Sequence, residues 1–125
     1  MSAKKKIIVV DDSETNLVLL EAILEDEGFI VKTAFSVKEA TELLKDYKPN
    51  LILLDLLMPN ENGFDLLKKL KLNSSYKDIP VIIVTAFANR ENSAIAFDLG
   101  AFDIIEKPID IPFFLEKVNK ALAIF

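Results

Sequence analysis

Three short runs of purely apolar residues constrain the fold of this chain more than any other feature of its sequence. They cover residues 7–10, 51–54 and 81–84, and none of them alternates apolar with polar side chains. A strand has this composition when both of its faces are covered, as in a parallel β-sheet with helices on either side. Weaker strand patterns cover residues 29–34 and 103–106.

The segments between these runs carry apolar residues at helical spacing. The first contains Leu17, Leu20 and Leu24 and stops before Gly28, a residue typical of helix ends. Further helical patterns cover residues 36–44, 64–70, 94–99 and 114–122. A strand followed by a helix, repeated five times, predicts a doubly wound α/β fold with a five-stranded parallel sheet between two layers of helices.

Composition and charge exclude several classes of function. The chain has 125 residues, about the length of one domain. Acidic residues outnumber basic ones by 20 to 15, and the net charge of -5 argues against nonspecific nucleic-acid binding. There is no cysteine and no histidine, which excludes disulfides, thiolate nucleophiles, Ser-His catalysis and histidine-ligated metals. Any chemistry must use carboxylates, hydroxyls, lysines and backbone groups.

The sequence also bears on location. The basic start at residues 1–6 is followed by only four apolar residues before two aspartates, too few for the core of a signal peptide. No segment approaches the roughly 20 apolar residues that span a bilayer. We therefore expect a cytoplasmic protein with no membrane partner.

Polar side chains follow four of the five predicted strands. Asp11 and Asp12 follow the first strand, Asp55 the third, Thr85 the fourth and Lys107 the fifth. In an open parallel sheet, ligands bind beyond the carboxyl ends of the strands, where the strand order reverses. A single aspartate after a strand is usually a turn or cap residue. We expect this set, however, to meet in one small volume.

The residue types suit metal binding and phosphoryl chemistry. Neighbouring carboxylates repel one another, and a bound cation relieves that repulsion. Because only oxygen ligands are available, Mg²⁺ or Mn²⁺ is the natural choice. An aspartate with an ordinary pKa of about 3.9 is ionised at neutral pH and can attack phosphorus directly to form an acyl phosphate. Threonine and lysine are suited to hold the remaining phosphoryl oxygens.

An ordered set of short motifs resembles the receiver domain of bacterial two-component response regulators. Each motif alone is weakly specific, but together they cover nearly the whole chain in the family's order and spacing. The resemblance implies a flavodoxin-like strand order, 2-1-3-4-5, and a single chemotaxis-type receiver domain over residues 1–125 without an output domain. The motifs are Val9-Val10-Asp11-Asp12-Ser13, Asp55-Leu56-Leu57-Met58-Pro59, Asn62-Gly63, Thr85-Ala86, Gly100-Ala101 and Lys107-Pro108.

The resemblance implies roles for the acidic residues. Asp55 would accept a phosphoryl group from the phosphohistidine of a sensor histidine kinase or a histidine phosphotransfer protein. Asp12 and Asp55 would bind Mg²⁺ through their carboxylates, and the backbone carbonyl of Leu57 would be a further ligand. Asp11 would act on the metal largely through water.

The resemblance also implies how the phosphoryl group is held and sensed. Thr85, the adjacent Ala86 and Lys107 would bind its oxygens, and Thr85 would shift the loop that follows it. The peptide bond before Pro108 would be cis, which is uncommon for X-Pro bonds in general. The family usually carries Tyr or Phe three residues before the lysine, as a rotamer switch, whereas this sequence has Ile104. We therefore expect a partial conformational shift, and we do not transfer the switch role to the nearby Phe102.

Bulky apolar residues border the predicted site. Leu57 and Phe87 lie two residues beyond the acceptor and the threonine. We expect them to hinder an attacking water, so that the phosphoryl group is long-lived.

The signal would be passed on through protein–protein contacts. The chain could then be a single-domain regulator or a phosphorelay shuttle. A receiver excised from a larger protein would show the same sequence pattern. Leu19 and Ile23 are candidate contacts for the kinase or phosphotransfer protein, although a core role is at least as probable for them. Residues 123–125 are apolar and suit packing on the sheet or a homodimer face.

Three alternatives remain open. A dehalogenase-type phosphatase needs Asp-x-Asp after the first strand, and position 13 is Ser. A flavodoxin-like flavin carrier needs a first loop rich in Ser, Thr and Gly, whereas the acidic residues 11–14 would repel a phosphate. A degenerate receiver that acts as a phosphorylation-independent scaffold is opposed by the intact set of site residues, but Ile104 leaves it possible.

Overall fold

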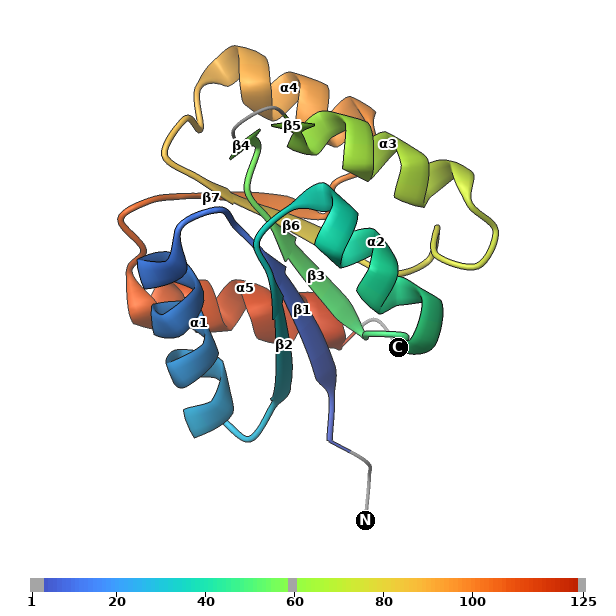
Figure 1. The fold of residues 1–125 in the computed structure, drawn as a ribbon. Coiled ribbons are helices and arrows are strands. Elements are labelled where there is room, and N and C mark those ends of the chain that lie inside the picture. Colours follow the sequence, from blue (N-terminus) through green and yellow to red (C-terminus); the bar gives the residue numbers. More distant parts are fainter. Residues whose placement is uncertain (1–3, 59–60, 124–125) are drawn as a thin grey trace.

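A five-stranded parallel sheet lies at the centre of the chain, with helices on both of its faces (Figure 1). The computed structural model describes residues 4–58 and 61–123. Neighbouring strands are all parallel and follow the order β2-β1-β3-β6-β7. Counted along the five strands of this sheet, the order is 2-1-3-4-5, so the predicted fold is confirmed. The strands are β1 (Lys6–Val10), β2 (Ile30–Ala34), β3 (Leu51–Leu54), β6 (Val81–Thr85) and β7 (Asp103–Glu106).

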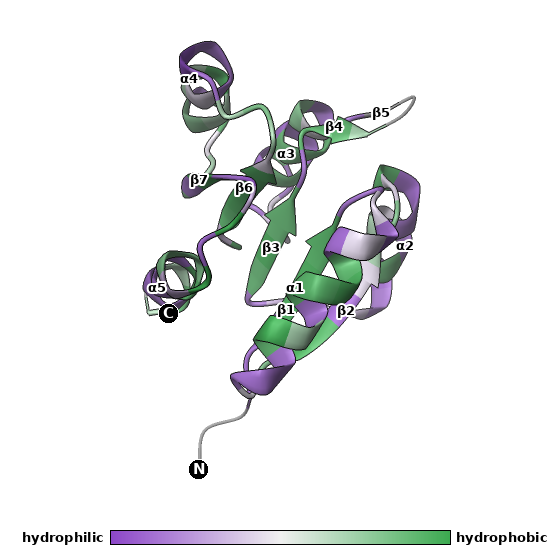
Figure 2. Cartoon of the chain, turned by 90° about the vertical axis from the view of Figure 1, so that its left-hand side faces the viewer, coloured by the Kyte–Doolittle hydropathy of each residue, from purple (hydrophilic) through white to green (hydrophobic). Residues whose placement is uncertain are grey.

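The helices form the two outer layers of a three-layer sandwich. One buried cluster joins the sheet to the first and last helices, and a second joins its other face to the three middle helices. The strands β1, β3 and β6 are hydrophobic along most of their length, whereas the helices carry hydrophilic stretches (Figure 2). On one face lie α1 (Glu14–Asp26) and α5 (Ile111–Leu122), and on the other α2 (Val37–Asp46), α3 (Gly63–Leu72) and α4 (Arg90–Asp98).

Side-chain caps explain where the helices begin. In each helix the residue before the first turn accepts a backbone amide that has no partner inside the helix. Ser36 accepts the amide of Glu39, and the Glu39 carboxylate accepts the amide of Phe35, an arrangement close to a capping box. The other caps are Ser13, Asn62, Asn89 and Asp110.

The predicted elements agree with the observed ones to within a few residues at their ends. The strand at 103–106 has the expected bounds, whereas α1 and α4 each begin several residues before their first apolar anchor because polar first turns carry no periodic signal. Gly28 follows the end of α1 with a φ of 92°, a conformation that suits glycine. The two-residue strands β4 (Leu57–Met58) and β5 (Glu61–Asn62), which form a small antiparallel pair, were not predicted. Strands this short leave no pattern in a sequence.

Some residues singled out in the sequence lie outside the described part of the chain. These are Pro59, in the motif after the predicted acceptor, and Ile124 and Phe125 at the apolar end. Among the described residues, no helix has both the length and the apolar character needed to cross a bilayer.

Candidate metal and phosphoryl site

The predicted site residues meet at the carboxyl ends of four strands. The amide of Asp55 donates to the Val10 carbonyl at 3.0 Å, and the amide of Asp11 donates to the Ala34 carbonyl at 3.1 Å. The hydrogen bonds of the sheet thus continue one residue past β1 and β3, into the site. This continuation fixes the backbone from which both carboxylates project.

Three carboxylates form the acidic part of the site. Asp11, Asp12 and Asp55 each place an oxygen within 4.8 Å of the others. Asp11 and Asp55 are buried, with exposed fractions of 2% and 7%, whereas Asp12 is exposed to solvent. A set of oxygen donors that includes two desolvated carboxylates fits a hard divalent cation such as Mg²⁺.

The backbone of Leu57 lies beside the predicted acceptor. Its amide donates to Asp55 Oδ1 at 3.4 Å, and Asp11 Oδ1 accepts the amide of Ser13 at 2.9 Å. Both buried carboxylates are therefore oriented by the chain two residues further on. These contacts involve the Leu57 amide, and the role of the Leu57 carbonyl as a metal ligand stays a prediction.

Lys107 bridges the two buried carboxylates. Its ammonium lies 2.7 Å from Asp11 Oδ2 and 3.2 Å from Asp55 Oδ2, and its side chain is 16% exposed. The Lys107 amide also donates to the Thr85 carbonyl at 2.9 Å, and the Lys107–Pro108 peptide bond is cis. The lysine is thus positioned by β6 and directed across the sheet edge toward β1 and β3.

Burial and charge act in opposite directions on these groups. Desolvation, reinforced by the nearby Asp11 charge, raises the pKa of Asp55, although Lys107 and Thr85 lower it in part. Burial alone would lower the pKa of Lys107, but its contacts with Asp11 and then Asp55 outweigh that effect and raise it. The lysine therefore remains charged, whereas Asp55 is held in an environment that disfavours its negative charge. A cation at the carboxylates would remove that penalty.

Thr85 lies at the end of β6 and is completely buried. Its Oγ1 accepts the amide of Phe87 at 3.2 Å, and its hydroxyl interacts with the Asp55 carboxylate and so helps to lower the pKa of that group. Ala86, between them, is exposed at the start of the loop that leads to α4. The threonine therefore connects the site to that loop.

The structure also places the residue that replaces the family's aromatic switch. Ile104 pairs with Ile83 in the sheet and packs against the buried cluster beneath α2, α3 and α4. Phe102 precedes β7 and packs against the opposite cluster, beneath α1 and α5. Phe102 therefore lies on the wrong side of the sheet to substitute for an aromatic at position 104.

Gly63 is a site-forming residue whose role was not recognised in the sequence. A side chain there would overlap the Asp55 carbonyl oxygen and approach the Leu56 Cα to 2.8 Å. The Gly63 amide donates to the Leu56 carbonyl at 2.8 Å, so the first turn of α3 packs directly against the backbone of Asp55 and Leu56. The only signal in the sequence was the dipeptide Asn62-Gly63 before an apolar helical pattern.

Comparison with known proteins agrees with this geometry. The response regulator receiver domain model matches residues 7–119. The polar-differentiation response regulator DivK of Brucella ovis is 34% identical over 118 residues, which cover 94% of this chain and 96% of DivK. A probable cyclic di-GMP phosphodiesterase of Vibrio cholerae is 36% identical over 116 residues, and the chain spans only 26% of its length.

A solved structure supports the same assignment. The CheY-like receiver domain protein from Methanospirillum hungatei superposes with a TM-score of 0.90 at 32% identity, and the match covers 97% of this chain and 95% of that one. The sheet order, the acidic cluster at its carboxyl edge and the family match lead to one conclusion: this chain belongs to the receiver domain family of two-component response regulators.

Proposed function

We propose that this receiver domain is switched by transfer of a phosphoryl group to Asp55, with Mg²⁺ held by the neighbouring carboxylates. The observation that carries the proposal is the contact of one Asp55 oxygen with Lys107, next to two further carboxylates that are close enough to share a cation. This arrangement provides a nucleophile, a metal site and a fixed positive charge in one partly desolvated place.

The transfer uses groups that the chain already positions. An Asp55 carboxylate oxygen attacks phosphorus, the P–N bond to the donor imidazole breaks, and the electron pair of that bond leaves with the imidazole nitrogen. Bound Mg²⁺ would neutralise charge on the transferring oxygens. Asp12, exposed at the rim, and the buried Asp11 and Asp55 would hold the ion. The Lys107 ammonium, released in part from Asp55, would then pair with a phosphoryl oxygen.

Thr85 couples the modified site to its surroundings. Its hydroxyl, which interacts with the Asp55 carboxylate, would donate to an oxygen of the phosphoryl group on that residue, while its oxygen already accepts the amide of Phe87. Movement of Thr85 toward the phosphoryl group would pull on the loop that leads to α4. Because Ile104 has no ring to rotate inward, we expect this pull to produce a partial shift of the equilibrium rather than full switching.

The partners would be a sensor histidine kinase or a histidine phosphotransfer protein, followed by a downstream protein target. The site-proximal part of α1 exposes Val18 and Leu19, with exposed fractions of 59% and 46%. Leu19 also lines a hollow of about 150 Å³ together with Asn16 and Pro108, next to Lys107. These residues form an apolar contact surface beside the acceptor, as a docking donor protein requires. Ile23 is half-buried against the core and contributes less to that surface.

The decisive experiment is phosphorylation of the purified protein with acetyl phosphate and Mg²⁺, followed by intact mass measurement. We expect a gain of one phosphoryl group in the wild type and in Asp46→Asn, which removes an exposed carboxylate at the end of α2. The gain should be absent from Asp55→Asn and from samples in which EDTA replaces Mg²⁺. A wild type that takes up no phosphoryl group would favour the scaffold alternative instead.

The rim of the site bears on how long the modification lasts. Leu57 and Phe87 are half-exposed, with exposed fractions of 50% and 53%, and both flank the residues that would hold the phosphoryl group. We expect slow hydrolysis, because these side chains exclude water from the approach to phosphorus. A half-life of seconds for the label in the purified, Mg²⁺-loaded protein would contradict this expectation.

A further inference from the structure

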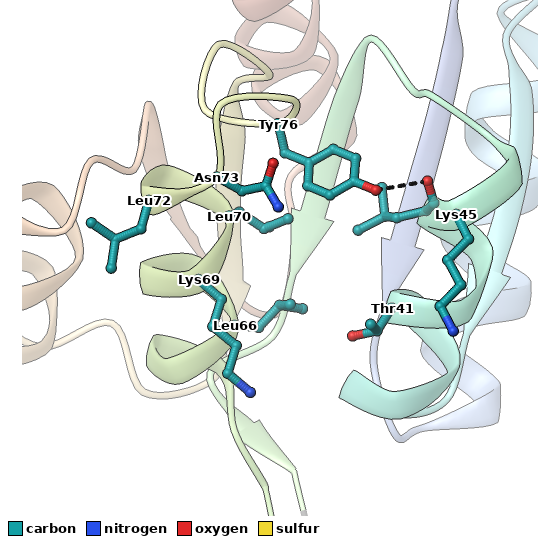
Figure 3. Close-up of a pocket in the computed structure, with 9 residues that line it drawn as sticks. Thr41, Lys45, Leu66, Lys69, Leu70, Leu72, Asn73 and Tyr76 are labelled. Atoms are coloured by element: carbon teal, nitrogen blue, oxygen red, sulfur yellow. Dashed lines mark hydrogen bonds between the residues drawn. The ribbon is translucent and has the colours of Figure 1, made fainter.

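A groove between α2 and α3 has no place in the proposed phosphotransfer (Figure 3). It encloses about 540 Å³, within the range of roughly 300–1,000 Å³ that is typical of small-molecule sites. Its floor is formed by Leu44, Leu66 and Leu70, which are 6%, 3% and 3% exposed and belong to the buried cluster on this face. A ligand in the groove would therefore contact a continuous apolar surface.

One end of the groove is closed. The Tyr76 ring lies across the gap between the two helices, and its hydroxyl donates to the Leu44 carbonyl at 3.1 Å (Figure 3). A helix with side chains is about 10–12 Å across and would have to run past this ring to lie along the groove. The closed end therefore favours a short ligand whose apolar part lies against Tyr76.

The charge of the groove is opposite to that of the protein. The chain carries 20 acidic residues, yet none of them lines the groove, whereas Lys45 and Lys69 do so from opposite helices. Lys69 is exposed and forms no ion pair with any residue in the described ranges 4–58 and 61–123. Lys45 contacts Glu42 at 3.1 Å, but both side chains are more than 60% exposed, so the pair is weak.

A further polar donor is available near the closed end. Asn73 Oδ1 accepts the amide of Ser75 at 2.8 Å, which leaves the side-chain NH₂ group of Asn73 without a hydrogen bond in the described part of the chain. Thr41 donates to the Val37 carbonyl at 2.8 Å, so its oxygen can only accept. Apart from this one acceptor, the polar groups left for a ligand are the Asn73 amide donor and the two lysine ammonium groups, which suit an anion.

We propose that the α2–α3 groove binds a small amphipathic organic anion, namely an alkyl or aryl carboxylate. Its apolar body would lie on the three leucines and against the Tyr76 ring, and its carboxylate would face the ammonium groups of Lys69 and Lys45. This site does not include the predicted acceptor residues, so the ligand and a phosphoryl group would not compete for the same side chains.

The test uses decanoate as the probe, below its micelle concentration, and observes the full chain by ¹⁵N and methyl NMR. We expect saturable shifts at Leu44, Leu66, Leu70 and Tyr76. Decyltrimethylammonium, which has the same chain and the opposite charge, should bind at least fivefold more weakly, and acetate should not shift these signals. Equal binding of the cation, or no saturable shifts with decanoate, would overturn the proposal.

Variants separate the groove from general surface effects. Lys69→Glu should weaken decanoate binding by about fivefold to tenfold, whereas Lys68→Glu, an exposed neighbour on α3 that does not line the groove, should leave it within twofold. Thr41→Trp should fill the groove and abolish binding without loss of thermal stability, because Thr41 is exposed. Asp55→Asn should bind decanoate as the wild type does. Equal effects of the two lysine variants, or binding of an acidic amphipathic peptide without any binding of decanoate, would contradict the proposal.

Discussion

The helices α1 and α4 are attached to the sheet very differently, although both follow strands that end in the site. The 13-residue α1 buries Leu17, Leu20 and Leu24, and its N-terminal cap, Ser13, is also hydrogen-bonded to the site through its amide. The nine-residue α4 buries only Ala96. Burial of a leucine side chain contributes on the order of 2 kcal/mol, far more than burial of an alanine methyl group.

Under the proposed function, this difference would combine a rigid phosphoryl site with a movable output region in one domain. Asp11 and Asp12 continue directly into the well-packed α1, so their positions are set by the core. Thr85 instead continues into a loop and the weakly packed α4, whose Ile95 and Phe97 are 39% and 48% exposed. A displacement of Thr85 that moves α4 therefore costs little free energy, whereas a displacement of α1 would cost much more.

The largest expected effect compares one core residue from α1 with one apolar residue from α4. Leu24→Ala should lower the free energy of unfolding by about 3 kcal/mol, because Leu24 is completely buried and its truncation leaves a cavity. Ile95→Ala should change it by less than about 0.5 kcal/mol. Urea denaturation of both variants measures the difference, and equal losses would remove the contrast between the two helices.

Lys107, at the end of β7, forms ion pairs with the carboxylates that precede α1 and follow β3. Its removal should therefore weaken the link between these parts of the sheet edge. Lys107→Met should lower the free energy of unfolding by about 2 kcal/mol without metal, because it leaves Asp11 and Asp55 buried without the positive charge that pairs with them. Added Mg²⁺ should restore part of the loss. The control Lys117→Met breaks the more exposed pair with Asp103 and should lower the free energy of unfolding by clearly less.

The same lysine predicts a dependence on alkaline pH. Its pKa is raised in the folded state, so its contribution to stability is complete below the ordinary lysine value of 10.5 and is lost as the pH rises through the folded-state pKa. The wild type should therefore lose stability above pH 10.5 more steeply than Lys107→Met. Parallel curves for the two proteins would show that the ion pairs do not stabilise the fold.

Amide hydrogen exchange tests the difference in local stability directly. We expect amides in α4 to exchange at least about tenfold faster than those in α1, because fewer apolar contacts oppose local opening. Addition of acetyl phosphate and Mg²⁺ should change exchange in residues 85–99 and leave the buried turns of α1 unchanged. A larger change in α1 than in α4 would reverse the proposed direction of the signal.

The smallest expected effect concerns the acceptor itself. Burial raises the pKa of Asp55, so its ionised form destabilises the metal-free fold at neutral pH. Asp55→Asn should therefore raise the melting temperature slightly in EDTA. The gain should shrink as the pH falls through the folded-state pKa toward 3.8, because the wild-type carboxyl is then also neutral. A melting temperature lowered by the substitution would mean that the contact with Lys107 outweighs desolvation.

Much of the fold and the site follows from a few local patterns. The unbroken apolar runs predict parallel strands because only a strand covered on both faces lacks polar alternation. The polar residues after those runs predict the site because the carboxyl ends of parallel strands meet at one edge. The roles of Asp55 and Thr85 came from the ordered motifs, not from periodicity.

Other features had no local signal. Gly63 lies so close to the Asp55 carbonyl that no side chain fits there. This contact forms only when α3 packs against the end of β3. The position of Phe102 beneath α1 and α5, rather than beside Ile104, depends on where β7 begins.

By itself, the sequence determined the strand runs and the set of polar groups at the strand ends, because these depend on neighbouring residues and on the geometry of a parallel sheet. Only the tertiary structure decided which of those charged groups form ion pairs with one another. The bridge from Lys107 to both Asp11 and Asp55 joins residues 96 and 52 positions apart. The raised pKa of Asp55 depends on the burial of its carboxyl by the surrounding elements. The basic groove forms only where α2 and α3 lie next to each other on one face of the sheet.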